Sequence, residues 1–318
     1  MKQTRSLKIS RRHLLEIAGF GMGAALLARR PLFAREEGIV PTMVNAAAQA
    51  KIKVIPVRRN ISVLEGSGGN VAVLTGPDGK LLVDAGFAVS RPAISHALAS
   101  INADPIKHLV NTHWHTDHTD GNQWLHEAGA AITAHENTRR RLSVATRVEG
   151  WDWTFPAVPA GALPVKIFPV KHEVHANHTK ITLKYYGPAH TDSDISVHFT
   201  EADVLHVGDT WWNGGYPFID YSTGGSIDGQ IQAAAANIAT VGSTTIVIPG
   251  HGPVGGKAEL VEFRDMLGTI RENVARLKKQ GRSLDETLAA NPTAEYDAKW
   301  GHYLTSPAAF TRLVYAGV

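Results

Sequence analysis

Six consecutive residues, about a third of the way along the chain, hold four side chains that can bind metal ions. The run His-Trp-His-Thr-Asp-His occupies residues 113–118 and directly follows 106–110, a short apolar segment typical of a buried strand. Residues two apart in an extended loop point the same way, so the first two histidines can share one ion. The aspartate and the last histidine can then turn towards a neighbouring ion. This run therefore requires a fold in which a strand end delivers the loop to a pocket for two ions.

Three later strand ends each offer one more candidate ligand, namely His190, Asp209 and His251. Glycine or proline stands close to each of them, which fits tight turns where the backbone passes near a site. The chain contains no cysteine, so no disulfide and no thiolate ligand is available. Any metal must therefore be bound by histidine and carboxylate side chains.

The remaining pattern alternates between strands and helices. We expect strands at 61–64, 71–75, 80–83, 106–110, 131–134, 175–177, 180–186, 195–200, 204–207 and 245–248, and helices at 91–100, from about 120, at 136–141, 228–239 and 258–279. Hairpins followed by alternating helices and strands occur twice, which predicts two facing sheets with helices outside. The aromatic, proline-rich segment 148–164 is expected to be a long loop that forms a lid or substrate wall, with surface packing as the alternative.

The HxHxDH run, followed in order by His190, Asp209 and the Gly-His-Gly at 250–252, resembles the metallo-β-lactamase superfamily. The resemblance covers residues 52–255. It implies an α+β fold, the four-layer αββα sandwich, with metals in a cleft at the strand ends. Residues 256–318 are then expected to form a helical extension packed on the same domain.

The resemblance also implies a binuclear metallohydrolase and a role for each candidate ligand. The first ion would be bound by His113, His115 and His190, the second by Asp117, His118 and His251, and Asp209 would bridge the two. Zinc is the expected metal, with iron or manganese as alternatives, because histidine and carboxylate ligands suit all three. Two such ions lower the pKa of a shared water and hold the resulting hydroxide against a bound carbonyl, and Asp117 is the expected catalytic residue that orients it.

Five further residues are candidates for supporting or substrate-binding roles: Asp84, Asp194, Trp212, Asn213 and Tyr216. Asp84 resembles an early aspartate of the family, and either aspartate could orient a ligand imidazole or simply shape a turn. The other three belong to an aromatic, glycine-rich run that we expect in the substrate wall. Asn213 or Tyr216 could donate a hydrogen bond to a developing oxyanion, with packing beneath the site as the alternative.

The first 34 residues have a charge pattern of their own. They contain seven basic residues and one acidic residue, so the net charge of +3 for the whole chain becomes about −3 for the remainder. The sequence pI near 9.0 therefore reflects this leader, and we expect no nucleic-acid partner.

The leader itself resembles a twin-arginine export signal. Arg11 and Arg12 precede a mostly apolar stretch that is short, interrupted by Glu16 and poorly suited to stable membrane insertion. We expect cleavage near Ala34, or as late as Ala50, and an uncleaved amphipathic anchor is the alternative. These features predict a periplasmic or secreted enzyme whose partner during export is the twin-arginine translocase.

The aspartate at position 209 narrows the class of substrate that we expect. Class B lactamases usually have Cys or Ser at the corresponding place, whereas glyoxalase II and many lactonases have Asp. We therefore expect an exported hydrolase of small-molecule esters, lactones, thioesters or cyclic amides. The alternatives are a β-lactamase, an iron-dependent sulfur dioxygenase, which needs one metal only, and a non-catalytic binding protein.

Overall fold

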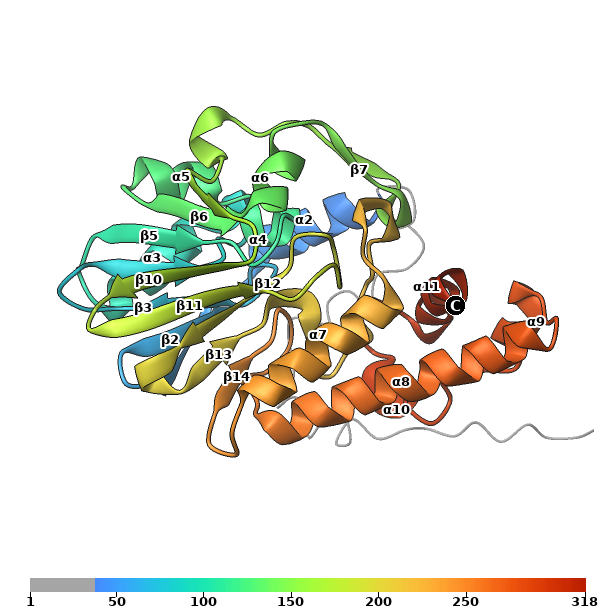
Figure 1. Ribbon diagram of the computed structural model, residues 1–318. Coiled ribbons are helices and arrows are strands. Elements are labelled where there is room, and N and C mark those ends of the chain that lie inside the picture. The colour runs from blue at the N-terminus through green and yellow to red at the C-terminus, as the bar shows by residue number, and fades with distance from the viewer. Residues whose placement is uncertain (1–37) are drawn as a thin grey trace, which may run out of the picture.

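Two mixed β-sheets pack face to face at the centre of the molecule (Figure 1). The computed structural model describes residues 38–318, so the predicted export signal lies outside the described residues. The first sheet has the order β1 (Lys53–Arg58), β2 (Ile61–Glu65), β3 (Val71–Leu74), β4 (Lys80–Val83), β5 (Ile106–Val110), β6 (Ala131–His135) and β9 (Lys166–Phe168). The second has the order β10 (Lys171–Ala176), β11 (Thr179–Tyr185), β12 (Ile195–Phe199), β13 (Val204–His206) and β14 (Ile246–Ile248). Each sheet begins with antiparallel pairs. The first ends with three parallel pairs and the second with one.

Alternation along each strand decides which side chains meet between the sheets. In β3, Ala72 and Leu74 pack against the second sheet, whereas Val71 and Val73 face the helices on the outside. Successive side chains of a strand point to opposite faces, and both faces of this sheet are covered, so all four residues are buried.

Helices form the two outer layers. Helices α3 (Arg91–Ile101) and α5 (Asn122–Glu127) cover the first sheet, and α7 (Ile227–Thr240), α8 (Lys257–Lys279) and α11 (Pro307–Gly317) cover the second. Figure 1 shows α8 running beside α7 at the edge of the molecule. The remaining helices of the C-terminal part are α9 (Leu284–Ala289) and α10 (Asp297–Trp300). This arrangement confirms the predicted four-layer αββα sandwich.

Segment 148–164 differs from its prediction as an unbroken loop. Strand β8 (Trp153–Phe155) pairs with β7 (Thr146–Val148) as a hairpin, and the intervening turn contains Asp152 in a left-handed conformation with φ 50°. The three residues of β8 are mostly exposed and form no apolar run, unlike the equally short β13 and β14, which is why the sequence did not reveal this strand. The neighbouring β9 was missed for the same reason.

The ends of several other helices and strands also differ from the predicted ones. The helix expected from about residue 120 begins earlier, because the single turn α4 (Thr116–Thr119) precedes α5. Strand β10 begins at Lys171 rather than at residue 175, and Asn177 lies in the following turn with φ 53°. Helix α6 (Glu136–Leu142) matches its prediction closely.

Helix α2 (Ile39–Gln49) was not predicted. Its buried side chains are Val40, Met43 and Ala47, spaced as expected for one face of a helix. The hydroxyl of Ser90 donates to the carbonyl of Ala47 at 2.9 Å, which fixes the end of the helix to the first half of the fold. Within residues 38–318, no helix is both long enough and apolar enough to cross a membrane.

Candidate metal centre

The seven candidate ligands meet at one edge of the two sheets. The 113–118 run follows β5 of the first sheet, with its last part in α4, while Asp209 and His251 follow β13 and β14 of the second sheet. His190 lies in the connection that leads into β12. The carboxyl ends of parallel strands meet at the same sheet edge, which is how residues far apart in the sequence come together here.

Three overlapping groups of side chains have the arrangement of a metal site. In each group the candidate ligand atoms lie within 4.8 Å of one another. The groups are His113, His115 and His190; His113, His118 and Asp209; and Asp117, His118 and His251.

Asp209 lies between the first and the third of these groups. Its Oδ1 is 3.1 Å from Nε2 of His118, and its Oδ2 is 3.4 Å from Nε2 of His190 and 3.3 Å from Nε2 of His251. One carboxylate therefore contacts histidines from both groups, which is the position that a bridging ligand needs.

Each histidine directs one ring nitrogen to the centre and the other to a partner outside it. The outer partners are the Thr112 hydroxyl for His113, Asp220 for His115, Asp84 for His118, the Phe218 carbonyl for His190 and the Tyr303 hydroxyl for His251. Such partners fix the orientation and tautomer of a metal-binding imidazole.

Unpaired buried atoms at the centre fit a bound cation. Nε2 of His113 is buried and has no hydrogen-bond partner among the described residues, and Nε2 of His118 and Oδ1 of Asp209, although 3.1 Å apart, are not aligned for a hydrogen bond. Buried polar atoms are rarely left without a partner, because the loss of hydration costs free energy. Imidazole nitrogens and carboxylate oxygens are also the ligands that zinc uses. The donor set therefore fits a pair of metal ions.

The pKa values of these groups reflect their mutual charges. Burial would raise the pKa of Asp209, but the imidazoles of His251 and His118 hold it well below its ordinary value. Burial would lower the pKa of His118, yet the nearby carboxylates, led by Asp209, raise it well above its ordinary value. The centre thus favours charged carboxylates balanced by positive charge, which protons or metal ions can supply.

Asp84 occupies the position expected of a residue that orients a ligand. Its Oδ2 accepts from Nδ1 of His118 at 2.7 Å, and its two oxygens also accept from the backbone and hydroxyl of Thr112. Asp84 itself has φ 68°, a left-handed conformation that turns the chain sharply after β4. Asp194 instead accepts from the backbone and hydroxyl of Thr191, and burial raises its pKa to about 8.

The aromatic run after Asp209, residues 211–216, contributes side chains both to the metal site and to the hydrophobic core. The Trp212 ring lies 4.5 Å from that of His251, measured between centroids, and Trp212 lines the cavity above the centre. Asn213 points elsewhere and donates to the carbonyl of Pro253 at 2.7 Å. Tyr216 is fully buried, stacks on Phe310 and donates to Asp297 at 2.9 Å. Neither Asn213 nor Tyr216 lines this cavity, so the structure does not place them for the expected hydrogen bond to an oxyanion.

The sequence prediction missed Asp220. Its Oδ2 lies 3.1 Å from Nε2 of His115, and it also accepts from the hydroxyls of Ser222 and Thr223. Burial would raise the pKa of Asp220, but His115 holds it at about 2, so it remains a carboxylate behind the imidazole. Asp220 belongs to no recognisable motif, and only its place in the fold reveals it.

Two glycines allow the backbone to approach the centre closely. A Cβ added at Gly69 would overlap the His118 ring, and one added at Gly250 would overlap Oδ1 of Asp209. These residues have no room for a side chain because ligands occupy the space.

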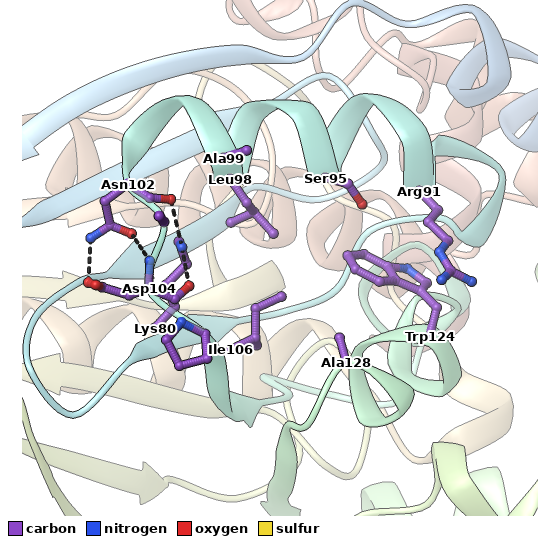
Figure 2. Close-up of a pocket in the computed structure, with 12 residues that line it drawn as sticks. Lys80, Arg91, Ser95, Leu98, Ala99, Asn102, Asp104, Ile106, Trp124 and Ala128 are labelled. Carbon is purple, nitrogen blue, oxygen red and sulfur yellow. Dashed lines mark hydrogen bonds between the residues drawn. The ribbon is translucent and has the colours of Figure 1, made fainter.

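A cavity of about 330 Å³ opens onto the centre and is lined in part by His115, Asp117, Asp209 and His251. Figure 2 shows a separate hollow beside α3, which shares no lining residue with this cavity. There Nζ of Lys80 donates to the carbonyl of Asn102 at 2.9 Å, and the Asn102 amide donates to Asp104. Lys80, Asn102 and Asp104 thus bind one another, as expected of a structural feature.

Comparison with known proteins agrees with this geometry. The family model described as the metallo-beta-lactamase superfamily matches residues 64–251, more than half of the chain. A hydroxyacylglutathione hydrolase from Erythrobacter litoralis (strain HTCC2594) is 26% identical over 214 residues, which cover 62% of this chain and 74% of that protein.

Solved structures show the same fold at low sequence identity. The stereoselective inverting sec-alkylsulfatase Pisa1 from Pseudomonas sp. is 17% identical, with a TM-score of 0.62 over 86% of this chain. The chain spans about half the length of that protein, 51%. The DIM-1 metallo-beta-lactamase is 20% identical, with a TM-score of 0.54 over 70% of this chain and 99% of the lactamase. With its His and Asp groups of the binuclear type, this chain belongs to the metallo-beta-lactamase superfamily and is a hydrolase of that superfamily.

Proposed function

We propose that this chain is an exported, zinc-dependent hydrolase that cleaves an ester, lactone, thioester or cyclic amide bond of a small molecule. The observation that carries the proposal is Asp209, whose two oxygens contact histidines of both metal groups. The relative named for hydrolysis of an acylglutathione supports an acyl-transfer reaction to water.

The residues around the centre have separable tasks in such a reaction. Two divalent ions, if bound by the seven ligands, would supply Lewis acidity and make water a stronger acid at neutral pH. Asp117 lines the cavity, and its Oδ2 lies 3.2 Å from Nε2 of His251. Burial would raise the pKa of Asp117, but His118 and His251 hold it at about 2, so it stays a carboxylate. It can therefore accept a hydrogen bond from the attacking water and orient it.

Metal analysis combined with a substrate panel tests this function. The metal-replete protein is assayed with aryl esters, lactones, thioesters and a chromogenic cephalosporin. We expect two zinc ions per chain and turnover of at least one of the first three classes. One iron per chain would favour the sulfur dioxygenase, and turnover of the cephalosporin alone would favour the β-lactamase. No turnover of any compound would overturn the proposal.

Replacement of Asp117 tests its assigned role. We expect Asp117→Ala to lower kcat by roughly 100-fold or more, since a positioned acid–base group contributes about that much. Circular dichroism should show the same fold. Asp152→Ala is the matched control, because Asp152 lies on the exposed hairpin and contacts Arg147. A kcat equal to that of the control would exclude a catalytic role for Asp117.

The proposed export depends on the paired arginines of the leader. We expect that changing Arg11 and Arg12 to lysine retains the full-length protein in the cytoplasm, as measured by fractionation of the bacterial cell. Transport of this variant at the normal level would argue against the twin-arginine route.

A further inference from the structure

The cavity above the metal centre has an apolar wall built from segments outside the family match at residues 64–251. Helix α2 contributes Ile39 and Met43, and the C-terminal part contributes Leu304 and one face of α11. Trp151 and Phe218 complete the wall from within the matched region, with their rings stacked at 5.1 Å between centroids. The floor consists of the candidate metal ligands, so a group bound in this cavity lies directly beside the reacting bond.

Helix α11 presents two different faces. Phe310 and Val314 are buried in the core against the second half of the fold. Ala309 and Ala316 point away from these two residues and line the cavity, and Leu313 lies between the two faces, where it lines the cavity and also packs against the core. An apolar second face on a helix that already packs on the core fits an apolar ligand.

One basic residue interrupts this apolar face. Arg312 lines the cavity, is exposed and makes no hydrogen bond or ion pair with any residue between 38 and 318. The other charged groups that line the cavity are the candidate metal ligands at its floor. A guanidinium has five donors arranged to bind carboxylate, sulfate or phosphate oxygens, so an unpaired arginine here is suited to an anionic group.

We propose that the substrate is an amphiphilic anion: an apolar acyl chain occupies the cavity between α2, Trp151 and α11, and Arg312 binds an anionic group carried by that chain. The inference rests on the proposed function, because it places the scissile carbonyl at the metal centre. It also separates this enzyme from hydrolases of glutathione thioesters. The peptide groups of glutathione would lose hydration beside Phe218 and Leu304 without gaining hydrogen bonds.

The test of the chain-binding site uses p-nitrophenyl acetate and p-nitrophenyl octanoate with the metal-replete enzyme. We expect kcat/KM to be at least tenfold higher for the octanoate. Ala309→Trp fills the cavity and should lower kcat/KM for the octanoate at least tenfold more than kcat/KM for the acetate, so that the preference is lost. Ala308→Trp is the matched control, because Ala308 is also exposed on α11 but does not line the cavity. Equal kcat/KM for the two esters, or an equal effect of the two variants, would overturn the apolar site.

The test of Arg312 compares p-nitrophenyl octanoate with the mono-p-nitrophenyl ester of suberate, which adds a carboxylate at the far end of the same chain. We expect wild type to favour the suberate ester about tenfold through KM, and Arg312→Gln to bring the KM values of the two esters to the same level. Arg264→Gln, at a half-buried position of α8 that does not line the cavity, should behave as wild type. A preference that survives in Arg312→Gln would overturn the assignment of this residue.

Ligand binding separates failure of this inference from failure of the proposed function. Calorimetry with suberate, octanoate and acetate measures occupancy of the cavity without any bond cleavage. We expect affinity to fall in that order, and Arg312→Gln to remove the advantage of suberate over octanoate. This result without ester turnover would support the binding site and overturn the hydrolase. Ester turnover with equal affinity for the three ligands would support the hydrolase and overturn the binding site for an amphiphilic anion.

Discussion

At the scale of single residues, carboxylates behind the ligands do as much to define the centre as the ligands themselves. Asp84 and Asp220 stand behind His118 and His115, one from the first half of the chain and one from the second. Both carboxylates are buried, so each can hold its imidazole in one orientation with little competition from water.

Asp220 is expected to control metal affinity through His115. We predict that Asp220→Asn weakens metal binding by about 10- to 100-fold, the usual effect of losing such an outer partner. Competition with a fluorescent chelator measures the affinity. Asp228→Asn is the control, because Asp228 pairs with Arg271 at the surface. Equal affinities in the two variants would show that Asp220 has no such role.

The sequence predicted the residues that meet at the centre because each lies beside a strand end or a tight turn. Asp84 could be predicted in the same way, from its place after a strand. Asp220 and Tyr303 could not, since each lies in an irregular segment and reaches the centre only through tertiary packing. Trp151 lines the cavity, in agreement with the substrate wall predicted for segment 148–164. Asn213 and Tyr216 show the opposite error: proximity to Asp209 in sequence did not bring their side chains into the cavity.

At the scale of elements, the sequence predicted the long and strongly patterned pieces. The continuous apolar run of β3 and the long amphipathic pattern of α8 are each sufficient to predict the secondary structure of that segment. The short and mostly exposed strands β8 and β9 form because neighbouring strands offer backbone partners, and that information is absent from the local pattern. Helix α2 was missed because its sequence overlaps an expected cleavage region.

Removal of α2 should affect both stability and substrate choice. A chain that begins at Lys51 loses the burial of Val40, Met43 and Ala47 and one wall of the cavity. We predict a Tm at least about 4 °C lower than that of a chain beginning at Gly38, from a loss of roughly 2 kcal/mol. The preference for p-nitrophenyl octanoate over the acetate should fall as well. An unchanged Tm and preference would show that α2 is dispensable, and cleavage as late as Ala50 would then cost the enzyme nothing.

At the scale of the whole molecule, the centre joins the two halves of the sandwich. His113, His115, Asp117 and His118 come from the first sheet, and His190, Asp209 and His251 from the second. Metal ions bound by both sets would therefore hold the sheets together, in addition to the apolar layer between them.

Metal removal should accordingly destabilise the entire fold. A ligand present at about 1,000 times its Kd stabilises the folded state by roughly 4 kcal/mol, so we predict that chelation lowers Tm by at least about 8 °C. Differential scanning calorimetry before and after chelation measures the change, and added zinc should reverse it. A single, unshifted transition would show that the centre does not couple the two sheets.

The division of the ligands between the sheets also has a consequence for the order of synthesis. A ribosome makes His113 and its neighbours early, but the third group of ligands stays open until His251 has been added and β14 has paired with β13. A chain that stops before that point can bind at most part of the metal. Binding of the full set of metal ions would therefore require that the ribosome has completed β14, the last strand of the second sheet.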